Sequence, residues 1–118
     1  MKKILIVDDE MGILEEVRDY LIEEGFEVLA TDTGKEGIIY LSNFKPDLML
    51  LDMKLPDMSG IEVLKACRQV STPTKVIVAT GYVDQKLIDE AEKLGRDAFM
   101  QKPFNLEHLR AEIDRLLA

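Results

Sequence analysis

The sequence has almost none of the residues that build disulfides and zinc centres. It contains one cysteine, Cys67, and one histidine, His108. A single cysteine cannot form an internal disulfide, and one cysteine with one histidine cannot supply a typical zinc site. Cys67 lies on the apolar face of a helical pattern, so we expect an inert core thiol. His108 lies in a helical pattern near the end of the chain, and we expect a solvated surface residue.

Long hydrophobic runs and an excess of basic residues are absent as well. No segment has the roughly 18 consecutive apolar residues of a membrane span, and the apolar stretch 4–7 meets Asp8 too soon for a signal peptide. We therefore expect a cytoplasmic protein with no membrane contact. Lys and Arg number 15 against 23 Asp and Glu, a net charge of −8. That charge opposes binding to a phosphate backbone, so we expect no direct contact with nucleic acid.

What the sequence does contain is a repeated alternation of short apolar runs with helical patterns. The 118 residues, 47% of them hydrophobic and 32% charged, fit one globular domain over residues 1–118. No low-complexity linker or internal repeat interrupts it. The apolar runs predict five strands, at 4–7, 27–30, 48–51, 76–79 and 98–100. Most are apolar on both faces, as in a parallel sheet covered by helices, so we predict a (βα)5 α/β fold.

Three of the expected helices begin at recognisable capping residues. Thr33 with Glu36, and Ser59 with Glu62, have the spacing of a capping box, in which each side chain binds a backbone amide at the helix start. Asn105 is the expected N-cap of the last helix. These positions predict where the second, third and fifth helices begin.

Residues capable of chemistry follow four of the five predicted strands. These residues are Asp8 and Asp9 after the first strand, Asp52 after the third, Thr80 after the fourth and Lys102 after the fifth. Crossovers between parallel strands are right-handed almost without exception, so the C-terminal ends of the strands lie along one edge of the sheet. Ligands of such sheets bind at that edge. The fold would therefore bring these residues together in one site.

The charges of this group indicate what else it must bind. Two carboxylates 4 Å apart repel each other by roughly 4 kcal/mol at an effective dielectric constant of 20. Lys102 supplies one positive charge, and Mg²⁺, which prefers oxygen ligands and takes only a few carboxylates, would supply the rest. A phosphoryl group could then approach Asp52, while Lys102, Thr80 and backbone amides balance its charge. The expected product is an aspartyl phosphate.

These motifs are similar to those of a known family. Asp8-Asp9, Asp52 in the segment DMKLPDMSG, Thr80-Gly81 and Lys102-Pro103 resemble, in order and spacing over the whole chain, the CheY-like receiver domain of two-component response regulators. The resemblance implies a flavodoxin-like, doubly wound parallel sheet with strand order 2-1-3-4-5. It also implies that Asp52 is the phosphoacceptor, and that the protein catalyses only its own phosphorylation and dephosphorylation instead of acting as an enzyme.

The resemblance also assigns the metal ligands. It implies that Asp9 and Asp52 bind Mg²⁺ directly, that Asp8 acts mainly through a bound water, and that the backbone carbonyl of Lys54 is a further ligand. Lys54 and Tyr82 each lie two residues after a site residue and should flank the route of an attacking water. Both side chains are bulky, so we expect slow self-dephosphorylation.

The switch residues follow from the same resemblance. Thr80 would bond a phosphoryl oxygen, Lys102 would pair with the phosphoryl group, and the bond from Lys102 to Pro103 should be cis. Phe99 would turn inward when Thr80 moves. Many relatives have Tyr at this position, and Phe lacks the hydroxyl, so the switch must act through packing. The output surface would comprise the fourth helix, the last strand and the last helix, at 87–94, 98–100 and 106–116.

The expected partners are proteins. The phosphodonor would be a histidine of a sensor kinase or a histidine phosphotransfer protein, presented by a helix that packs near Ile13, Pro103 and Phe104. Downstream, the signal would pass to a target protein or an effector domain. The segment LLDMKLPDMSGIEVLK is similar to single-domain regulators of sporulation-type phosphorelays, but transcriptional regulators share such segments. Both a stand-alone protein and part of a longer regulator stay open, and we expect a monomer or a weak dimer on phosphorylation.

Two other protein classes share parts of this pattern. A haloacid dehalogenase-type phosphatase also uses a strand-end Asp, but it needs a second acid two residues later, where this chain has Lys54, and a cap segment, which is not recognisable here. A flavodoxin-like flavin binder needs a first loop that cradles phosphate, where this chain has Asp8, Asp9 and Glu10. Taken singly, each motif also fits a structural role, such as a solvated acidic turn or a strand end.

Overall fold

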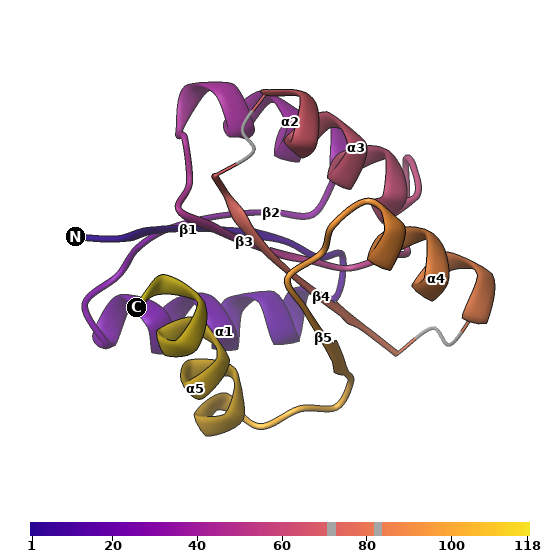
Figure 1. The fold of residues 1–118 in the computed structure, drawn as a ribbon. Helices are drawn as coiled ribbons and strands as arrows, with labels where there is room; N and C mark the ends of the chain where they lie inside the picture. Colours follow the sequence, from indigo (N-terminus) through magenta and orange to yellow (C-terminus); the bar gives the residue numbers. More distant parts are fainter. Residues whose placement is uncertain (71–72, 82–83) are drawn as a thin grey trace.

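Five parallel strands form one sheet in the order β2-β1-β3-β4-β5 (Figure 1). The computed structural model describes residues 1–70, 73–81 and 84–118. The strands are β1 (Lys3–Val7), β2 (Glu27–Thr31), β3 (Leu48–Leu51), β4 (Lys75–Thr80) and β5 (Ala98–Gln101). The helices are α1 (Met11–Glu23), α2 (Gly34–Asn43), α3 (Gly60–Val70), α4 (Gln85–Lys93) and α5 (Leu106–Leu117). The (βα)5 fold and the strand order are confirmed, and each predicted strand end is correct to within one residue.

The helices cover both faces of the sheet. Helices α2, α3 and α4 lie on one face, and α1 and α5 lie on the other (Figure 1). Successive side chains of a strand point to opposite faces, so Leu5 and Val7 of β1 pack with the first group of helices. Ile4 and Ile6 pack with the second group. The central strands are therefore buried on both sides, which explains their continuous apolar runs.

The register of the sheet brings the C-terminal ends of the strands together. Val7 at the end of β1 pairs with Leu51 at the end of β3. Beyond this pair, the amide of Asp52 donates to the carbonyl of Val7 at 2.9 Å. On the neighbouring strands, the amide of Lys102 donates to the carbonyl of Thr80 at 3.0 Å. The amide of Asp8, after β1, likewise donates to the carbonyl of Thr31 at 3.1 Å, so the residues that follow β1, β3 and β5 are held by backbone bonds along one edge of the sheet.

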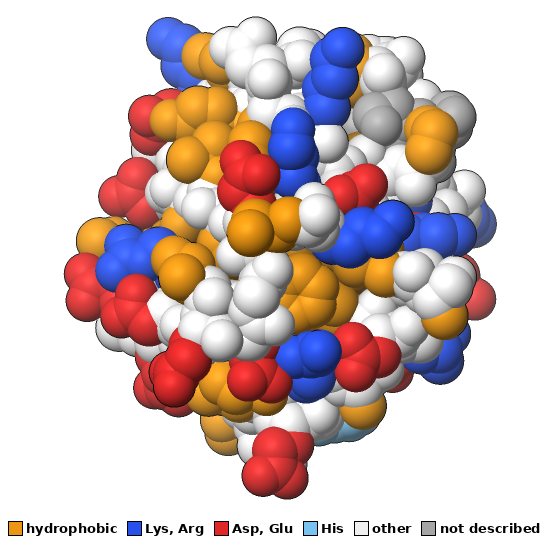
Figure 2. Space-filling view, turned by 90° about the vertical axis from the view of Figure 1, so that its left-hand side faces the viewer, with side chains coloured by type: hydrophobic (Ala, Val, Ile, Leu, Met, Phe, Trp, Pro, Cys, Tyr) orange, Lys and Arg blue, Asp and Glu red, His pale blue; other side chains and the backbone are white. Residues whose placement is uncertain are grey.

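The face at the opposite ends of the strands lies near both chain termini. Figure 2 shows this face, on which Lys and Arg side chains lie beside Asp and Glu side chains and hydrophobic side chains. Among the described residues, no helix combines the length and the apolar character that a membrane span requires.

Cys67 is fully buried and His108 is exposed, as predicted. Burial raises the pKa of the Cys67 thiol, which keeps it protonated and unreactive.

The two predicted capping boxes are only half correct. Thr33 Oγ1 accepts a hydrogen bond from the amide of Glu36 at 3.3 Å, but Glu36 Oε1 accepts from the Thr33 hydroxyl at 3.3 Å instead of from a backbone amide. Ser59 Oγ accepts from the amide of Ile61 at 3.1 Å and not from that of Glu62. Both residues still mark helix starts, because each hydroxyl binds one amide of the first turn.

The starts of the last two helices are capped by single side chains. Asn105 Oδ1 accepts from the amide of His108 at 2.6 Å, which confirms the predicted N-cap of α5. Asp84 Oδ1 accepts from the amide of Lys86 at 2.9 Å and caps α4, which the sequence did not predict. Side-chain oxygens of this kind satisfy amides that have no partner within the helix.

Candidate functional site

Side chains from three strand ends meet around the ammonium group of Lys102. Lys102 Nζ lies 2.6 Å from Oδ2 of Asp8, 2.9 Å from Oε1 of Glu10 and 3.0 Å from Oδ2 of Asp52. Asp8 and Asp52 are each 5% exposed and Lys102 is 9% exposed, so this contact is largely shielded from water. The predicted convergence of Asp8, Asp52 and Lys102 is therefore confirmed. Glu10, which had no predicted role, completes the group.

The backbone orients the carboxylates of this group. The amide of Glu10 donates to Oδ1 of Asp8 at 2.9 Å. The amide of Lys54 donates to Oδ1 of Asp52 at 3.3 Å. Each of these aspartates therefore has one oxygen bound by a nearby amide and the other bound by Lys102. The two bonds restrict the rotation of each carboxylate, so the site is ordered before any ligand binds.

Burial and charge pairing set the protonation of the group. Burial raises the pKa of Asp8 above its usual value, although the hydrogen bond from Lys102 acts in the opposite direction. Burial alone would lower the pKa of Lys102, but hydrogen bonds to Asp8, Glu10 and Asp52 raise it well above its usual value. Lys102 therefore stays protonated near neutral pH. One ammonium cannot balance three ionised carboxylates, so the group can accept a further cation.

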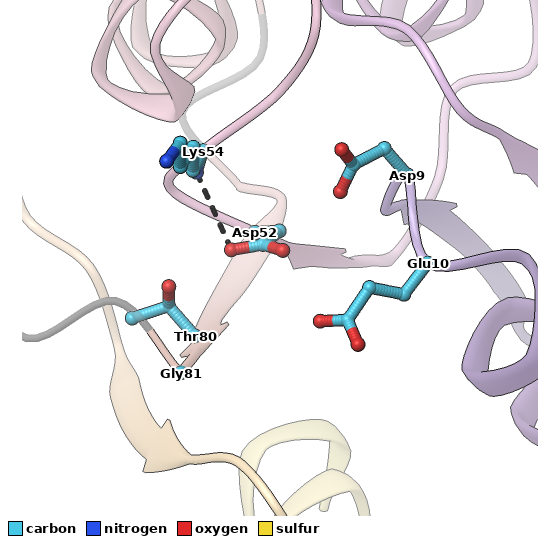
Figure 3. Close-up of a pocket in the computed structure, with 6 residues that line it drawn as sticks. All are labelled: Asp9, Glu10, Asp52, Lys54, Thr80 and Gly81. Atoms are coloured by element: carbon cyan, nitrogen blue, oxygen red, sulfur yellow. Dashed lines mark hydrogen bonds between the residues drawn. The ribbon is translucent and has the colours of Figure 1, made fainter.

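A crevice of about 270 Å³ opens beside this group (Figure 3). The residues that line it are Asp9, Glu10, Asp52, Lys54, Thr80 and Gly81. Asp9 and Glu10 extend into it from the segment after β1, and Thr80 lies across from them beyond Asp52 (Figure 3). Thr80 is only 1% exposed, so little of this lining side chain reaches solvent. The crevice joins a buried carboxylate to solvent, which a reaction with an external donor requires.

The acidic residues fit a divalent cation. Asp8, Glu10 and Asp52 each offer one carboxylate oxygen, and these three oxygens lie within 4.8 Å of one another. Oxygen-only donor sets suit hard cations such as Mg²⁺ and Ca²⁺. Of the predicted ligands, Asp8 and Asp52 belong to this group. Asp9 and Lys54 line the crevice next to it.

The predicted switch residue lies away from the crevice. Phe99 is half-buried in β5 and packs against the layer formed by α2, α3 and α4. The guanidinium carbon of Arg96 lies 5.9 Å from the centre of its ring. Tyr82, predicted to flank the route of water, lies outside the described residues. Phe99 is thus held by apolar packing and a cation–π contact.

The predicted partner-contact residues lie on the other layer. Ile13 and Phe104 are half-buried against the layer formed by α1 and α5, and Pro103 is exposed. The bond between Lys102 and Pro103 is cis, as expected. Ile13 therefore both packs on the core and presents part of its surface, instead of standing clear of the core.

Two further contacts were not predicted from the sequence. Glu10 was recognised as acidic, but only the fold shows that it reaches Lys102. Asp57, in the loop after β3, accepts hydrogen bonds from the amides of Gly34 and Lys35 at 2.8 and 2.9 Å. Pro56 and Gly60 indicate a loop, but no local pattern links that loop to α2. The run of three acids after the first strand was the one available signal for Glu10.

Comparison with known proteins identifies the family to which this chain belongs. The family model of the response regulator receiver domain matches residues 4–114. The chain therefore belongs to the response regulator receiver domain family, which separates it from the phosphatase and flavin-binding classes. It is 34% identical over 116 residues to "Sporulation initiation phosphotransferase F" of Bacillus subtilis, covering 98% of this chain and 94% of the relative. It is 35% identical over 113 residues to "Cell cycle transcriptional regulator CtrA" of Caulobacter vibrioides, covering 94% of this chain but 48% of the relative.

Solved structures agree with this assignment. A CheY-like response regulator receiver domain protein from Methanospirillum hungatei superposes with a TM-score of 0.95 at 37% identity, covering 98% of this chain and 94% of that one. Response regulator TrrA from Thermotoga maritima, solved in complex with Mg²⁺-BeF, superposes with a TM-score of 0.87 at 33% identity, covering 98% of this chain and 99% of that one. The Thermotoga maritima protein that was solved with Mg²⁺-BeF is therefore a response regulator with the same fold as this chain.

Proposed function

We propose that Asp52 accepts a phosphoryl group from a phosphohistidine of a sensor kinase or a histidine phosphotransfer protein. The observation that carries this proposal is the state of the Asp52 carboxylate. It is 5% exposed, one oxygen lies 3.0 Å from Lys102 Nζ, and the other accepts from the Lys54 amide at 3.3 Å. It lines the crevice together with Thr80. A carboxylate oriented in this way can act as a nucleophile towards a donor that enters the crevice.

The reaction would exchange one bond to phosphorus for another. A carboxylate oxygen of Asp52 forms the new P–O bond, the P–N bond to the donor imidazole breaks, and its electron pair returns to the imidazole nitrogen. Lys102 compensates negative charge on the phosphoryl oxygens, and the Thr80 hydroxyl donates to one of them. Mg²⁺ supplies charge neutralisation at the same oxygens when it is bound. The chain modifies itself and returns to its starting state on dephosphorylation, so it is a signalling protein and not an enzyme with an external substrate.

The proposed Mg²⁺ ligands are three aspartates and one backbone carbonyl. Asp9 and Asp52 would bind the cation directly, Asp8 would act mainly through a water, and the backbone carbonyl of Lys54 would complete the protein ligands. This proposal is supported by the excess of carboxylates over ammonium groups around Lys102 and by the Mg²⁺-BeF complex of the Thermotoga maritima relative. Occupation of the site would offset the repulsion among these acids.

The proposed output of phosphorylation is a change in the surface formed by α4, β5 and α5. Thr80 would move towards the phosphoryl group and Phe99 would turn inward, so that the signal passes to a downstream protein or an effector domain. The donor protein would pack near Ile13, Pro103 and Phe104, which present exposed or partly exposed apolar surface next to the site. The sporulation phosphotransferase of Bacillus subtilis, which this chain matches over nearly its whole length, supports a role in a phosphorelay. We expect no direct contact with nucleic acid.

The lifetime of the phosphorylated state should depend on Lys54. Its side chain is exposed at the crevice, where it can hinder an attacking water. Tyr82 is proposed to do the same from the segment after Thr80. Replacing both with alanine should speed hydrolysis of the aspartyl phosphate, measured as the decay of the phosphorylated mass. An unchanged decay rate would remove this role.

Intact-protein mass after incubation with acetyl phosphate tests the main proposal. We expect one added phosphoryl group that requires both Mg²⁺ and Asp52, so that the Asp52→Asn variant gains none. Asp19→Asn is the matched control, because Asp19 is an exposed acid on α1, away from the crevice. If Asp52→Asn is phosphorylated like the wild type, or if neither acetyl phosphate nor a phosphorylated histidine kinase modifies the wild type, the proposal is wrong.

A further inference from the structure

The start of α2 is capped from a distant part of the chain. Oδ1 of Asp57 accepts from the amide of Gly34 at 2.8 Å, and Oδ2 accepts from the amide of Lys35 at 2.9 Å. Thr33 caps the next amide, that of Glu36, from the chain segment just before the helix. A carboxylate at a helix N-terminus is favoured by the helix dipole as well as by these bonds. We call the two bonds made by Asp57 the Asp57 cap.

Asp57 lies in the loop that carries the proposed phosphoacceptor. This 52–60 loop begins at Asp52 and ends at Gly60, the first residue of α3. Its two sides are joined by an antiparallel bridge between Lys54 and Ser59, and the amide of Gly60 donates to the carbonyl of Met53 at 2.7 Å. The loop is therefore closed at its base, directly beside Asp52. A displacement of its outer part will be passed to Lys54 through these bonds.

The loop is packed tightly at both ends as well as hydrogen-bonded. A Cβ on Gly34 would lie 2.4 Å from Cγ of Met58, so the outer part of the loop rests directly on the backbone of α2. A Cβ on Gly60 would lie 2.3 Å from the carbonyl oxygen of Asp52. Both distances are shorter than real Cβ contacts. Glycine therefore lets the Met58 side chain lie against α2 at Gly34, and it lets two backbone segments approach closely at Gly60. The loop thus connects the α2 start to the backbone of Asp52.

We propose that Asp57 is a positioning residue for the phosphorylation site. By binding the start of α2, it holds the 52–60 loop so that the Lys54 carbonyl and the Asp52 carboxylate face the cation. This inference rests on the proposed function, because it concerns the same metal and phosphoryl site. Hydrogen bonds from Gly34 and Lys35 lower the pKa of Asp57, so the ionised carboxylate forms this cap near neutral pH.

Three variants separate positioning from simple helix capping. Asp57→Ala removes both bonds of the Asp57 cap. Asp57→Asn keeps one acceptor oxygen and should retain part of the effect. Thr33→Ala is the matched control, because it removes a side-chain cap from the same helix without touching the 52–60 loop. Two measurements are made on each protein: amide hydrogen exchange by NMR without metal, and Mg²⁺ affinity by titration calorimetry.

We expect faster amide exchange in the 52–60 loop and weaker Mg²⁺ binding in Asp57→Ala, but not in Thr33→Ala. The amide of Gly60 should exchange at least tenfold faster than in the wild type, because its bond to the carbonyl of Met53 closes the loop. The amide of Lys54 should exchange at least tenfold faster as well, because its bond to Oδ1 of Asp52 depends on the position of the loop. The dissociation constant for Mg²⁺ should rise about threefold to tenfold, at or below the lower end of the roughly 10–100-fold range for outer-shell partners of metal sites, because Asp57 acts through the loop. Asp57→Asn should lie between the wild type and Asp57→Ala. Thr33→Ala should change neither quantity, although it will lower thermal stability.

The inference is overturned if Asp57→Ala keeps the exchange rates of the wild type, or if Thr33→Ala changes exchange and affinity as much as Asp57→Ala does. The second result would make Asp57 an ordinary helix cap. Failure of the proposed function looks different. A wild type that acetyl phosphate and histidine kinase leave unmodified would refute phosphorylation, while the exchange rates of Lys54 and Gly60 would still decide whether Asp57 positions the loop.

Discussion

The ammonium nitrogen of Lys102 lies 3.0 Å from Oδ2 of Asp52, although 50 residues separate them in the sequence. The same nitrogen lies 2.6 Å from Oδ2 of Asp8. All three side chains are buried. Lys102 therefore serves two purposes before phosphorylation: it offsets the repulsion between the carboxylates, and it keeps one oxygen of the proposed phosphoacceptor in a fixed place.

Replacing Lys102 with methionine should destabilise the metal-free protein. Methionine keeps most of the volume but removes the charge, which leaves Asp8 and Asp52 buried without a cation. We expect the free energy of unfolding to fall by about 3 kcal/mol. Millimolar Mg²⁺ should restore part of this loss, because the cation takes over the compensation. Urea unfolding with and without Mg²⁺ measures both effects. Lys86→Met, at an exposed position on α4, is the control, and equal stability of the two variants would contradict the prediction.

The packing of Phe99 should govern the balance between two states of α4. Relaxation-dispersion NMR should show exchange in α4 without a phosphoryl mimic and its loss when beryllofluoride is added, because coupling of 1–3 kcal/mol leaves a minor state populated. Arg96→Gln removes the cation–π contact with Phe99. This should raise the minor-state population about twofold to fivefold, in proportion to the ~0.5–1 kcal/mol of an exposed contact. Identical dispersion with and without the mimic would refute the switch.

Adding a methyl group at Gly60 should displace the backbone of the phosphoacceptor. The new Cβ would lie 2.3 Å from the carbonyl oxygen of Asp52 and 2.8 Å from Cα of Met53. We expect Gly60→Ala to cost about 2 kcal/mol in the free energy of unfolding and to slow phosphorylation. Gly12→Ala is the control, because no atom lies within 4 Å of its added Cβ. That variant should be neutral or up to about 1 kcal/mol more stable, and a similar loss in both variants would argue against the contact.

Ionised Asp57 should stabilise the folded protein, and this stabilisation should be lost at acidic pH. Hydrogen bonds from Gly34 and Lys35, and then the charge of Lys35, lower its pKa in the folded state. A lowered pKa means that this contribution is present above about pH 4 and is lost as the pH falls through the folded-state value. The melting temperature of Asp57→Asn should therefore be below that of the wild type at pH 7, with a gap that narrows between pH 4 and pH 2. A constant gap across this range would contradict the assignment.

Arg68 should stabilise the fold without affecting phosphorylation. Its Nη1 donates to the carbonyl of Thr74 at 2.8 Å, and its Nη2 donates to the carbonyl of Gly95 at 2.6 Å and to Oδ2 of Asp97 at 3.1 Å. These bonds join α3 to the segments before β4 and β5, at the end of the sheet opposite the crevice. We expect Arg68→Ala to cost about 2–3 kcal/mol. Arg68→Lys should recover little, because an ammonium cannot form the same fork. If Arg68→Ala also lowers the rate of phosphorylation of the folded protein, the prediction is wrong, and the Arg68 end of the sheet is coupled to the crevice.

The elements of the fold were largely readable from local patterns. Leu48–Leu51 was predicted with both ends correct, because a strand covered on both faces must be apolar throughout. The cap at Asn105 was also correct, since an amide oxygen before a helical pattern has one obvious partner. Asp84 was missed because a short polar residue in a loop need not cap the helix that follows. The capping box at Ser59 was wrong in detail, because its hydroxyl binds the amide of Ile61.

The candidate site was predictable in its members but not in its contacts. Asp8, Asp52 and Lys102 could be grouped because each follows a strand of a parallel sheet. The role of Glu10 was not predictable, since its reach to Lys102 depends on where two loops pass each other in space. The Asp57 cap joins residues that are 22 and 23 positions apart in the sequence. No pattern in either segment predicts that it contacts the other.

The sequence by itself determined the periodicities, and with them the strands, the helices and the strand-end positions of Asp52, Thr80 and Lys102. It did so because burial of apolar side chains and capping of helix ends act over a few neighbouring residues. Only the tertiary structure decided that one ammonium contacts three acids and that Asp57 binds the start of α2. Hydrogen bonds and ion pairs act over about 3 Å, so such partners are chosen only after the sheet and its helices have brought distant segments together.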